Sequence, residues 1–199
     1  MDHLNVTETP SVLDALRRDT ERVGFTMASE PQTGSLLRTL AASKPGGRFL
    51  ELGTGTGVGA AWLLAGMDSD SHLDSVDTDE TVQEIARRHL GHDARVTFHI
   101  ADGAVFLESS RLQQFDFIYA DAWPGKFSYL ELALSLLRVG GIYLVDDLLP
   151  QPHWPEGHAP KVPLLMDQLE HRHGFVATKL AWASGLMILV RTHAVSTAR

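Results

Sequence analysis

Apolar residues recur along this chain in two alternating patterns, one typical of strands and one typical of helices. Short apolar runs that end in a polar residue predict strands, and apolar positions three or four residues apart predict helices. The predicted strands in the first three quarters of the chain are Arg48–Leu52, Leu73–Val76, Arg95–Ile100, Phe115–Ala120 and Ile142–Val145. The predicted helices that alternate with them are Gly57–Met67, Asp79–Leu90, Gly103–Ser109 and Tyr129–Leu137. This alternation is typical of a parallel, doubly wound α/β sheet.

The two ends of the chain depart from the alternation. Two helices, Ser11–Val23 and Pro31–Ala42, are predicted before the first strand. Near the other end, the turn residues Ala183-Ser184-Gly185 separate two apolar runs, Phe175–Trp182 and Leu186–Val190, which predicts an antiparallel hairpin. We therefore expect seven strands, mostly parallel, in one domain over residues 1–199, with a helical extension at 1–45 and the α/β core at 46–199.

Composition narrows the classes of partner. The chain has 199 residues, of which 44% are hydrophobic, and a formal charge of −8. That acidic balance argues against nucleic acid, because nucleic-acid binders usually carry a basic stripe. The absence of cysteine excludes disulfides and thiolate sites. No secretory or membrane-spanning apolar segment is recognisable, so we expect a cytoplasmic protein with no membrane partner.

A glycine-rich turn follows the first predicted strand. After Glu51 come four alternating glycines, at positions 53, 55, 57 and 59. Glycines at this spacing allow a tight strand-to-helix turn and a close backbone approach to a ligand. The pattern Gly55-x-Gly57-x-x-Ala60 also fits a relaxed dinucleotide fingerprint, so a nicotinamide-dependent oxidoreductase stays an alternative. Glu51 favours a cationic ligand over a pyrophosphate, although local backbone donors could also satisfy it.

Several acids lie directly after predicted strands, where ligands bind in doubly wound sheets. Asp77 can accept hydrogen bonds from ribose hydroxyls or cap the next helix, and Asp102 is a good helix cap. Asp121 and the pair Asp146-Asp147 follow strands whose ends would be only about 5 Å apart if the strands are neighbours. Three carboxylates that close repel one another unless a cation neutralises them. Oxygen ligands favour Mg²⁺, Ca²⁺ or Mn²⁺, whereas a helix cap or a backbone contact would need no metal.

Taken in order, these motifs resemble the class I S-adenosylmethionine-dependent methyltransferases. The narrower resemblance is to the small catechol and caffeoyl-CoA-type O-methyltransferases and their bacterial relatives, from about Met27 to Val190. It implies a Rossmann-like fold whose N-terminal helices cover the cofactor. The residues that it implies for S-adenosylmethionine binding are Met27, Ala28, Glu51, Gly53, Thr54, Gly55, Gly57, Gly59, Asp77, Thr78, Asp102, Gly103 and Asp121.

The resemblance also implies a metal and a base. Asp121, Asp146 and Asp147 match the ligands of a divalent metal, Mg²⁺ or else Mn²⁺ or Ca²⁺, although the family has Asn where this chain has Asp147. Asp121 and Lys126 are the implied catalytic residues, with Lys126 as general base. The spacing between them is longer than in the catechol enzyme, and a solvated loop lysine is the alternative. If the metal is present, activity depends on Mg²⁺ or Mn²⁺.

We therefore expect methyl transfer from S-adenosylmethionine to a hydroxyl oxygen of a small molecule, assisted by a divalent metal. The alternatives are a metal-independent N- or O-methyltransferase, the oxidoreductase and a cofactor-binding protein without catalysis. The proline-rich loop over 150–163 is expected to act as a lid, with His153, Trp154 and His158 facing the substrate, while Trp123 stacks on an aromatic substrate or is buried. The N-terminal helices are expected either to pair two subunits into a homodimer or only to cover the cofactor.

Overall fold

The structure, a computed structural model, describes residues 6, 8–152 and 154–193. Seven strands form one sheet in the order β3-β2-β1-β4-β5-β7-β6. Their bounds are β1 Arg48–Leu52, β2 His72–Asp77, β3 Val96–Ile100, β4 Phe115–Ala120, β5 Leu137–Val145, β6 Phe175–Leu180 and β7 Leu186–Arg191. Strands β1 to β5 pair in parallel, whereas β7 runs antiparallel to both β5 and β6. The predicted fold class, including the C-terminal hairpin, is confirmed.

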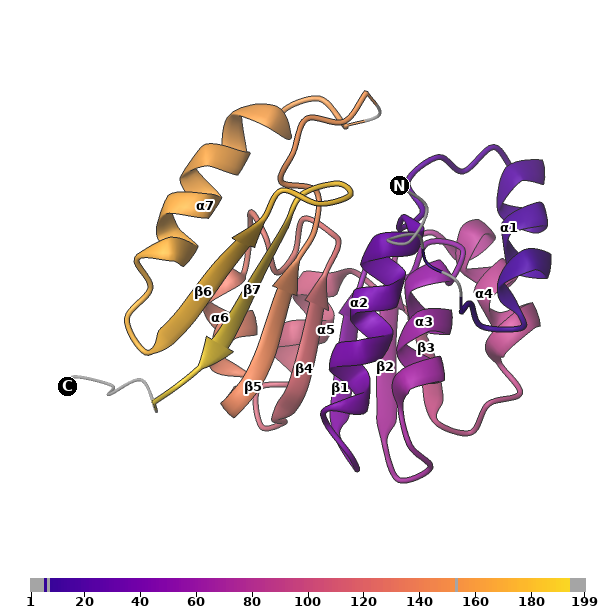
Figure 1. Cartoon of the computed structure of the whole chain (residues 1–199), viewed down its shortest axis with the longest axis horizontal. Helices are drawn as coiled ribbons and strands as arrows, with labels where there is room; N and C mark the ends of the chain where they lie inside the picture. Colours follow the sequence, from indigo (N-terminus) through magenta and orange to yellow (C-terminus); the bar gives the residue numbers. More distant parts are fainter. Residues whose placement is uncertain (1–5, 7, 153, 194–199) are drawn as a thin grey trace.

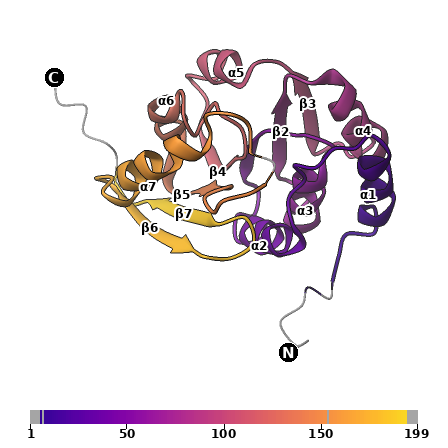
Figure 2. The ribbon, with the colours of Figure 1, turned by 90° about the horizontal axis from the view of Figure 1, so that it is seen from above.

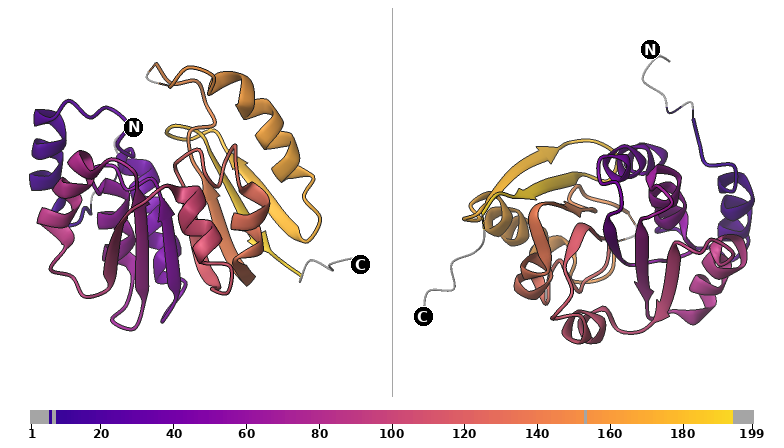
Figure 3. Two further views of the ribbon diagram at one scale, coloured as in Figure 1. Left: turned by 180° about the vertical axis from the view of Figure 1, so that it is seen from behind. Right: turned by 90° about the horizontal axis from the view of Figure 1, so that it is seen from below.

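Helices cover both faces of the sheet (Figures 1 and 2). Their bounds are α1 Leu13–Arg22, α2 Pro31–Ala42, α3 Val58–Gly66, α4 Glu80–Leu90, α5 Gly103–Ser109, α6 Leu130–Ser135 and α7 Val162–Glu170, with a short 3₁₀ helix, η2, at Ala159–Lys161. Helices α2 and α3 lie on one face, and α1 packs against α4 near the β3 edge. The views from behind and from below show the other face, covered by α5, α6 and α7 (Figure 3). In the described part of the chain, no helix combines the length and apolar character needed to cross a membrane.

Side chains of the strands contribute to two hydrophobic cores, one on each face, because successive side chains point to opposite faces of a sheet. Phe49 and Phe117 lie in the core beneath α2 and α3, with ring centroids 5.8 Å apart. Their neighbours Leu50 and Ile118 lie in the opposite core, with residues of α5, α6 and α7. Burial on both faces explains why β1 and β4 are mostly apolar in the sequence.

Strand β5 is longer than its sequence pattern predicts. It begins at Leu137 instead of Ile142 and runs through Gly140 and Gly141, which look like a turn in the sequence. Leu137 pairs with Phe115, and the register then shifts before Phe117. Helix α6 accordingly ends at Ser135, because Leu137, the expected last residue of the helix, joins the sheet and Leu136 caps the helix. The expected boundary at residue 46 falls in the turn between α2 and β1, and the division into extension and core stays a prediction.

Candidate active site

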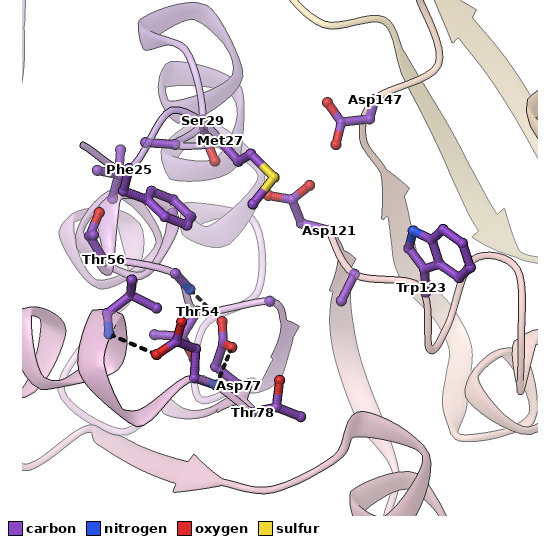
Figure 4. A pocket seen from close by; sticks show the side chains of 18 of the residues that line it. Phe25, Met27, Ser29, Thr54, Thr56, Asp77, Thr78, Asp121, Trp123 and Asp147 are labelled. Carbon is purple, nitrogen blue, oxygen red and sulfur yellow. Dashed lines mark hydrogen bonds between the residues drawn. The ribbon is translucent and has the colours of Figure 1, made fainter. Parts of the chain in front are cut away.

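A cavity of about 400 Å³ opens at the carboxyl ends of β1, β2 and β4 (Figure 4). The order of the sheet reverses between β1 and β4, and such a switch point is where doubly wound sheets bind ligands. Five segments form the walls: the chain before α2, the glycine turn, the end of β2, the loop after β4 and the loop after β5. The lining residues are Phe25, Met27, Ala28, Ser29, Gly53, Thr54, Gly55, Thr56, Val58, Gly59, Asp77, Thr78, Asp79, Val82, Asp121, Ala122, Trp123, Pro124, Lys126, Asp147, Pro155 and His158.

The glycine turn needs glycine for two physical reasons. Gly53 and Gly57 have φ angles of +104° and +91°, which strain any residue with a Cβ. A Cβ on Gly53 would also lie 2.8 Å from the backbone oxygen of Asp121. The turn thus passes close to the end of β4 and leads directly into the N-terminus of α3, whose backbone N–H groups favour an anionic ligand group.

Asp77 anchors this turn from the end of β2. Its Oδ2 accepts a hydrogen bond of 2.7 Å from the backbone N–H of Gly55, and its Oδ1 accepts one of 3.0 Å from the N–H of Asp79. Asp79, not Asp77, caps α4 through the N–H groups of Thr81 and Val82. Asp77 and its neighbour Thr78 face the cavity below the turn (Figure 4), so the carboxylate is placed to meet a ligand hydroxyl.

Glu51 lies beneath the turn rather than in the cavity lining. Its side chain has no exposed surface, and Gly59 separates it from the cavity, since a Cβ on Gly59 would overlap Glu51 Oε1. Ser75 donates a 2.5 Å hydrogen bond to Oε2, whereas Oε1 has no hydrogen-bond partner within the described residues. Burial raises the pKa of Glu51 to about 8, opposed by the Ser75 bond and reinforced by nearby Asp77. Its role toward the cofactor ammonium stays a prediction.

Replacing Glu51 with glutamine is expected to stabilise the ligand-free protein increasingly as the pH rises. A carboxyl group whose pKa rises from 4.5 to about 8 on folding favours the folded state below pH 4.5 and loses that contribution as the pH climbs to 8. The advantage of E51Q should therefore grow by a few kcal/mol between pH 5 and pH 9. Thermal unfolding at both pH values measures it, and E84Q on the exposed side of α4 is the control. An advantage that does not change with pH would contradict the assignment.

Asp102, Gly103 and Gly57 lie outside the cavity lining. The Asp102 carboxylate accepts a 2.7 Å hydrogen bond from the N–H of Ala104 and caps α5. A Cβ on Gly103 would lie 2.9 Å from Pro124, so this glycine allows α5 to approach the loop after β4. Their roles at the cofactor stay predictions.

The three predicted metal ligands do not converge on one point, and a lysine lies among them. Lys126 Nζ is 3.7 Å from Asp121 Oδ1 and 3.6 Å from Asp147 Oδ2, and it donates a 3.3 Å hydrogen bond to the backbone oxygen of Asp146. Its side chain is only 2% exposed. Lys126 is therefore a buried partner of the acids and not a solvated loop lysine.

Asp146 points into a different network. Its Oδ2 accepts a 2.5 Å hydrogen bond from Tyr119, and its Oδ1 accepts from the N–H of Asp147 and from Ser184. The Tyr119 hydroxyl also lies 3.3 Å from Asp121 Oδ2 and 3.0 Å from Ser29 Oγ, so it links β4, β5 and the chain before α2. Tyr119 was not among the predicted site residues, although a tyrosine two residues before an acid at a strand's end was a usable signal.

These contacts test the expected divalent metal. Both oxygens of Asp146 already accept hydrogen bonds, and the ammonium of Lys126 lies between the other two carboxylates. Within residues 6, 8–152 and 154–193 there is no group of three His, Cys, Asp or Glu side chains placed to hold a metal ion. The residues present therefore do not fit the group that the resemblance implies, and the metal remains unconfirmed.

Burial and mutual repulsion raise the pKa values of both Asp121 and Asp146. Burial raises the pKa of Asp121 well above its usual value, Asp146 adds to that rise and Lys126 opposes it. Burial and the charge of Asp147 raise the pKa of Asp146 to about 6, while hydrogen bonds from Ser184 and Tyr119 oppose that shift. The site thus holds more carboxyl groups than positive charges, and Lys126 is the cation among them.

The loop after β5 closes over this cluster through aromatic contacts. The ring of Trp154 stacks on His158 at 4.4 Å, and His158 Nε2 donates to the backbone oxygen of Asp147 at 3.2 Å. Pro155 and His158 reach the main cavity, and Trp154 lines a smaller adjoining cavity of about 70 Å³ beside the acids. Trp123, 39% exposed, forms a side wall. His153 lies outside the described residues, and a lid function stays a prediction.

A seven-stranded sheet of this order, with a glycine turn and an anchoring acid at the next strand's end, is typical of Rossmann-like methyltransferases. A methyltransferase-domain family model matches residues 50–148. Putative O-methyltransferases of Mycolicibacterium smegmatis and Mycobacterium marinum are 30% and 31% identical over 145 and 128 residues, or 68% and 59% of this chain. These matches span 66% and 55% of the two relatives. The chain belongs to the class I S-adenosylmethionine-dependent O-methyltransferase family.

Solved structures agree at the level of the fold. A putative O-methyltransferase from Klebsiella pneumoniae gives a TM-score of 0.81 at 24% identity, covering 96% of this chain and 93% of its own. An O-methyltransferase from Bacillus cereus in complex with SAH gives a TM-score of 0.82 at 21% identity, covering 96% of this chain and 94% of its own. TomG from Streptomyces achromogenes, in complex with SAM and involved in tomaymycin synthesis, gives 0.81 at 23% identity with the same coverage.

Proposed function

We propose that this protein transfers the methyl group of S-adenosylmethionine to a hydroxyl oxygen of a small molecule. The observation that carries the proposal is the cavity at the switch point of the sheet, in which Asp77 anchors the glycine turn and faces the ligand space. Family membership supports it, because the curated relatives are named O-methyltransferases.

The proposed cofactor seat follows from the chemistry of the lining. The amino-acid tail of S-adenosylmethionine would lie at the glycine turn and the N-terminus of α3, where backbone N–H groups suit its carboxylate. The ribose would lie at Asp77, whose carboxylate can accept hydrogen bonds from both hydroxyls. The predicted cofactor residues that line the cavity are Met27, Ala28, Gly53, Thr54, Gly55, Gly59, Asp77, Thr78 and Asp121.

In the proposed reaction, the acceptor oxygen attacks the methyl carbon in line with the carbon–sulfur bond. That bond breaks, its electron pair stays on sulfur and S-adenosylhomocysteine leaves; the hydroxyl proton passes to solvent. The enzyme's contribution is to hold oxygen and methyl in attack geometry. The adjoining cavity beside Asp121, Asp147 and Trp154 is the candidate place for the acceptor. No step is assigned to a divalent metal, because the acids present do not form its ligand set.

Binding to S-adenosylhomocysteine but not to NAD⁺ is the expected outcome of a two-ligand test. At a ligand concentration 100 times the Kd, a bound ligand stabilises the fold by about 2.7 kcal/mol, which raises Tm by roughly 5–10 °C for a chain of this size. Calorimetric titration and thermal unfolding measure both quantities. NAD⁺ binding without S-adenosylhomocysteine binding would favour the oxidoreductase. Transfer of labelled methyl groups to a panel of phenols, alcohols and amines then separates O- from N-transfer and both from a non-catalytic binder.

Other parts of the proposal concern partners and location. The acidic charge of −8 supports a small acceptor over nucleic acid. A cytoplasmic location and a homodimer formed through the N-terminal helices also belong to the proposal, and gel filtration with light scattering tests the second.

A further inference from the structure

We propose that the ammonium group of Lys126 holds the place of a divalent metal between Asp121 and Asp147. The site would then carry its cation as part of the chain and would work without a bound metal ion. What this cation does to the acceptor rests on the proposed methyl transfer, whereas its position in the acidic cluster does not.

The geometry around the ammonium is that of a cation site. Lys126 Nζ lies 3.7 Å from a carboxylate oxygen of Asp121, 3.6 Å from one of Asp147 and 3.3 Å from the backbone oxygen of Asp146. The oxygens come from the ends of two neighbouring strands, β4 and β5. A divalent ion bound by the same oxygens would need distances of about 2.0–2.6 Å, so it would have to displace the ammonium.

The loop that carries Lys126 is held in place from both sides. Gly125 has a φ of +91°, and its backbone oxygen accepts a 2.6 Å hydrogen bond from buried Tyr143. The N–H of Lys126 donates to the backbone oxygen of Trp123 at 3.0 Å, which closes a tight turn. Phe127 packs edge-on against His158 at 4.8 Å. The extra residues between Asp121 and Lys126 therefore form an anchored turn that directs the lysine back into the acids.

The remaining acid is bound elsewhere. Asp146 would complete a three-carboxylate metal site, but Tyr119, Ser184 and the N–H of Asp147 already donate to its two oxygens. Releasing it would leave those buried donors without an acceptor, at a cost of about 1–3 kcal/mol for each. The cluster is thus arranged around an ammonium group and is not preorganised for a metal.

A lysine cation has consequences for the acceptor. Lys126 lines the main cavity, and its two partners Asp121 and Asp147 line both the main and the adjoining cavity. Its charge therefore lies where the two cavities meet and is available to an acceptor oxygen that becomes negative. A metal can chelate two neighbouring oxygens, whereas an ammonium group is a point charge with three donors. Recognition through Lys126 therefore requires one hydroxyl on the acceptor and no vicinal diol.

Manganese binding tests the position of the cation without any substrate. We expect no Mn²⁺ binding by the unaltered protein at millimolar ion, by calorimetry or electron paramagnetic resonance. Lys126→Ala opens the space between the two carboxylates and is expected to bind Mn²⁺ with a Kd at least about tenfold below the highest ion concentration at which the unaltered protein shows no binding, with a rise in Tm on adding the ion. Lys126→Ser repeats the test should the alanine variant fail to fold, and Lys161→Ala, which removes an exposed lysine near Trp123, is the matched control.

The outcomes separate clearly. Mn²⁺ binding that appears in K126A and is lost again in K126A/D147N supports the proposal. Mn²⁺ binding by the unaltered protein as tight as by K126A overturns it, and so does an absence of binding in every variant. S-adenosylhomocysteine titration of the same samples reports on the proposed function separately, so a failure there leaves the manganese result readable.

Discussion

Replacing Asp77 with alanine is expected to reduce the affinity for S-adenosylhomocysteine by at least about 100-fold. The carboxylate anchors the glycine turn through the N–H of Gly55 and also faces the cavity, where the ribose is proposed to lie. A hydrogen bond to a charged group contributes about 1.5–3 kcal/mol. Losing the two bonds to the ribose therefore costs about 3–6 kcal/mol, which exceeds the 2.7 kcal/mol that corresponds to 100-fold. Calorimetric titration measures the loss.

Asp79 offers the control, because it is an acid two residues away that also borders the cavity. Its carboxylate caps α4, so Asp79→Ala should cost about 1 kcal/mol of stability and leave the affinity within about threefold. Asp77→Asn keeps an acceptor oxygen for the N–H of Gly55, so its affinity for S-adenosylhomocysteine should lie between those of D77A and D79A. If D77A binds S-adenosylhomocysteine as well as D79A does, the ribose does not lie at Asp77.

The fold was predictable from the sequence because its signals are local. Strands β1 and β4 are short, mostly apolar runs, and β1, β2 and β4 are each followed directly by a polar residue or a glycine. The hairpin of β6 and β7 followed from three turn residues between two apolar runs. The start of β5 was not predictable in this way: Gly140 and Gly141 lie in the irregular stretch between the pairs Leu137–Phe115 and Ile142–Phe117, and only the pairing of Leu137 with β4 shows that the strand begins before them.

The sequence indicated several residues that line the cavity, but not the contacts that they make. Position after a strand was enough to select Asp77 and Asp121, which do face the cavity. The same rule selected Asp146, whose oxygens turn toward Tyr119 and Ser184, residues from other strands and loops. The place of Lys126 depends on a turn whose shape is set by contacts with β5 and the loop after it. Such long-range contacts leave no periodic signal in the sequence.

Gly34 lies in α2 where that helix contacts α3, and Gly34→Ala is expected to destabilise the protein by about 2–3 kcal/mol. Alanine is favoured over glycine by about 1 kcal/mol in an ordinary helix. Here, however, a Cβ on Gly34 would overlap the indole of Trp62, which is fully buried in the core beneath α2 and α3. Gly66 makes the same close approach from the other helix, since its Cβ would overlap the backbone oxygen of Arg38. Neither helix can retreat without opening that core, and overpacking costs about 1–3 kcal/mol or more.

Thermal unfolding should show the loss as a fall in Tm of roughly 5–10 °C. Thr39→Ala, on the exposed side of the same helix, tests the effect of helix propensity alone and should change Tm little. Because α2 begins directly after the cavity wall formed by Met27 to Ser29, a displaced α2 should also weaken S-adenosylhomocysteine binding in G34A but not in T39A. Pairing G34A with Trp62→Leu should cost less than the sum of the two changes, since the smaller side chain makes room for the methyl group. Strict additivity in this cycle would mean that the helices tolerate the methyl group by another route, and that the contact between Gly34 and Trp62 does not fix the wall of the cavity.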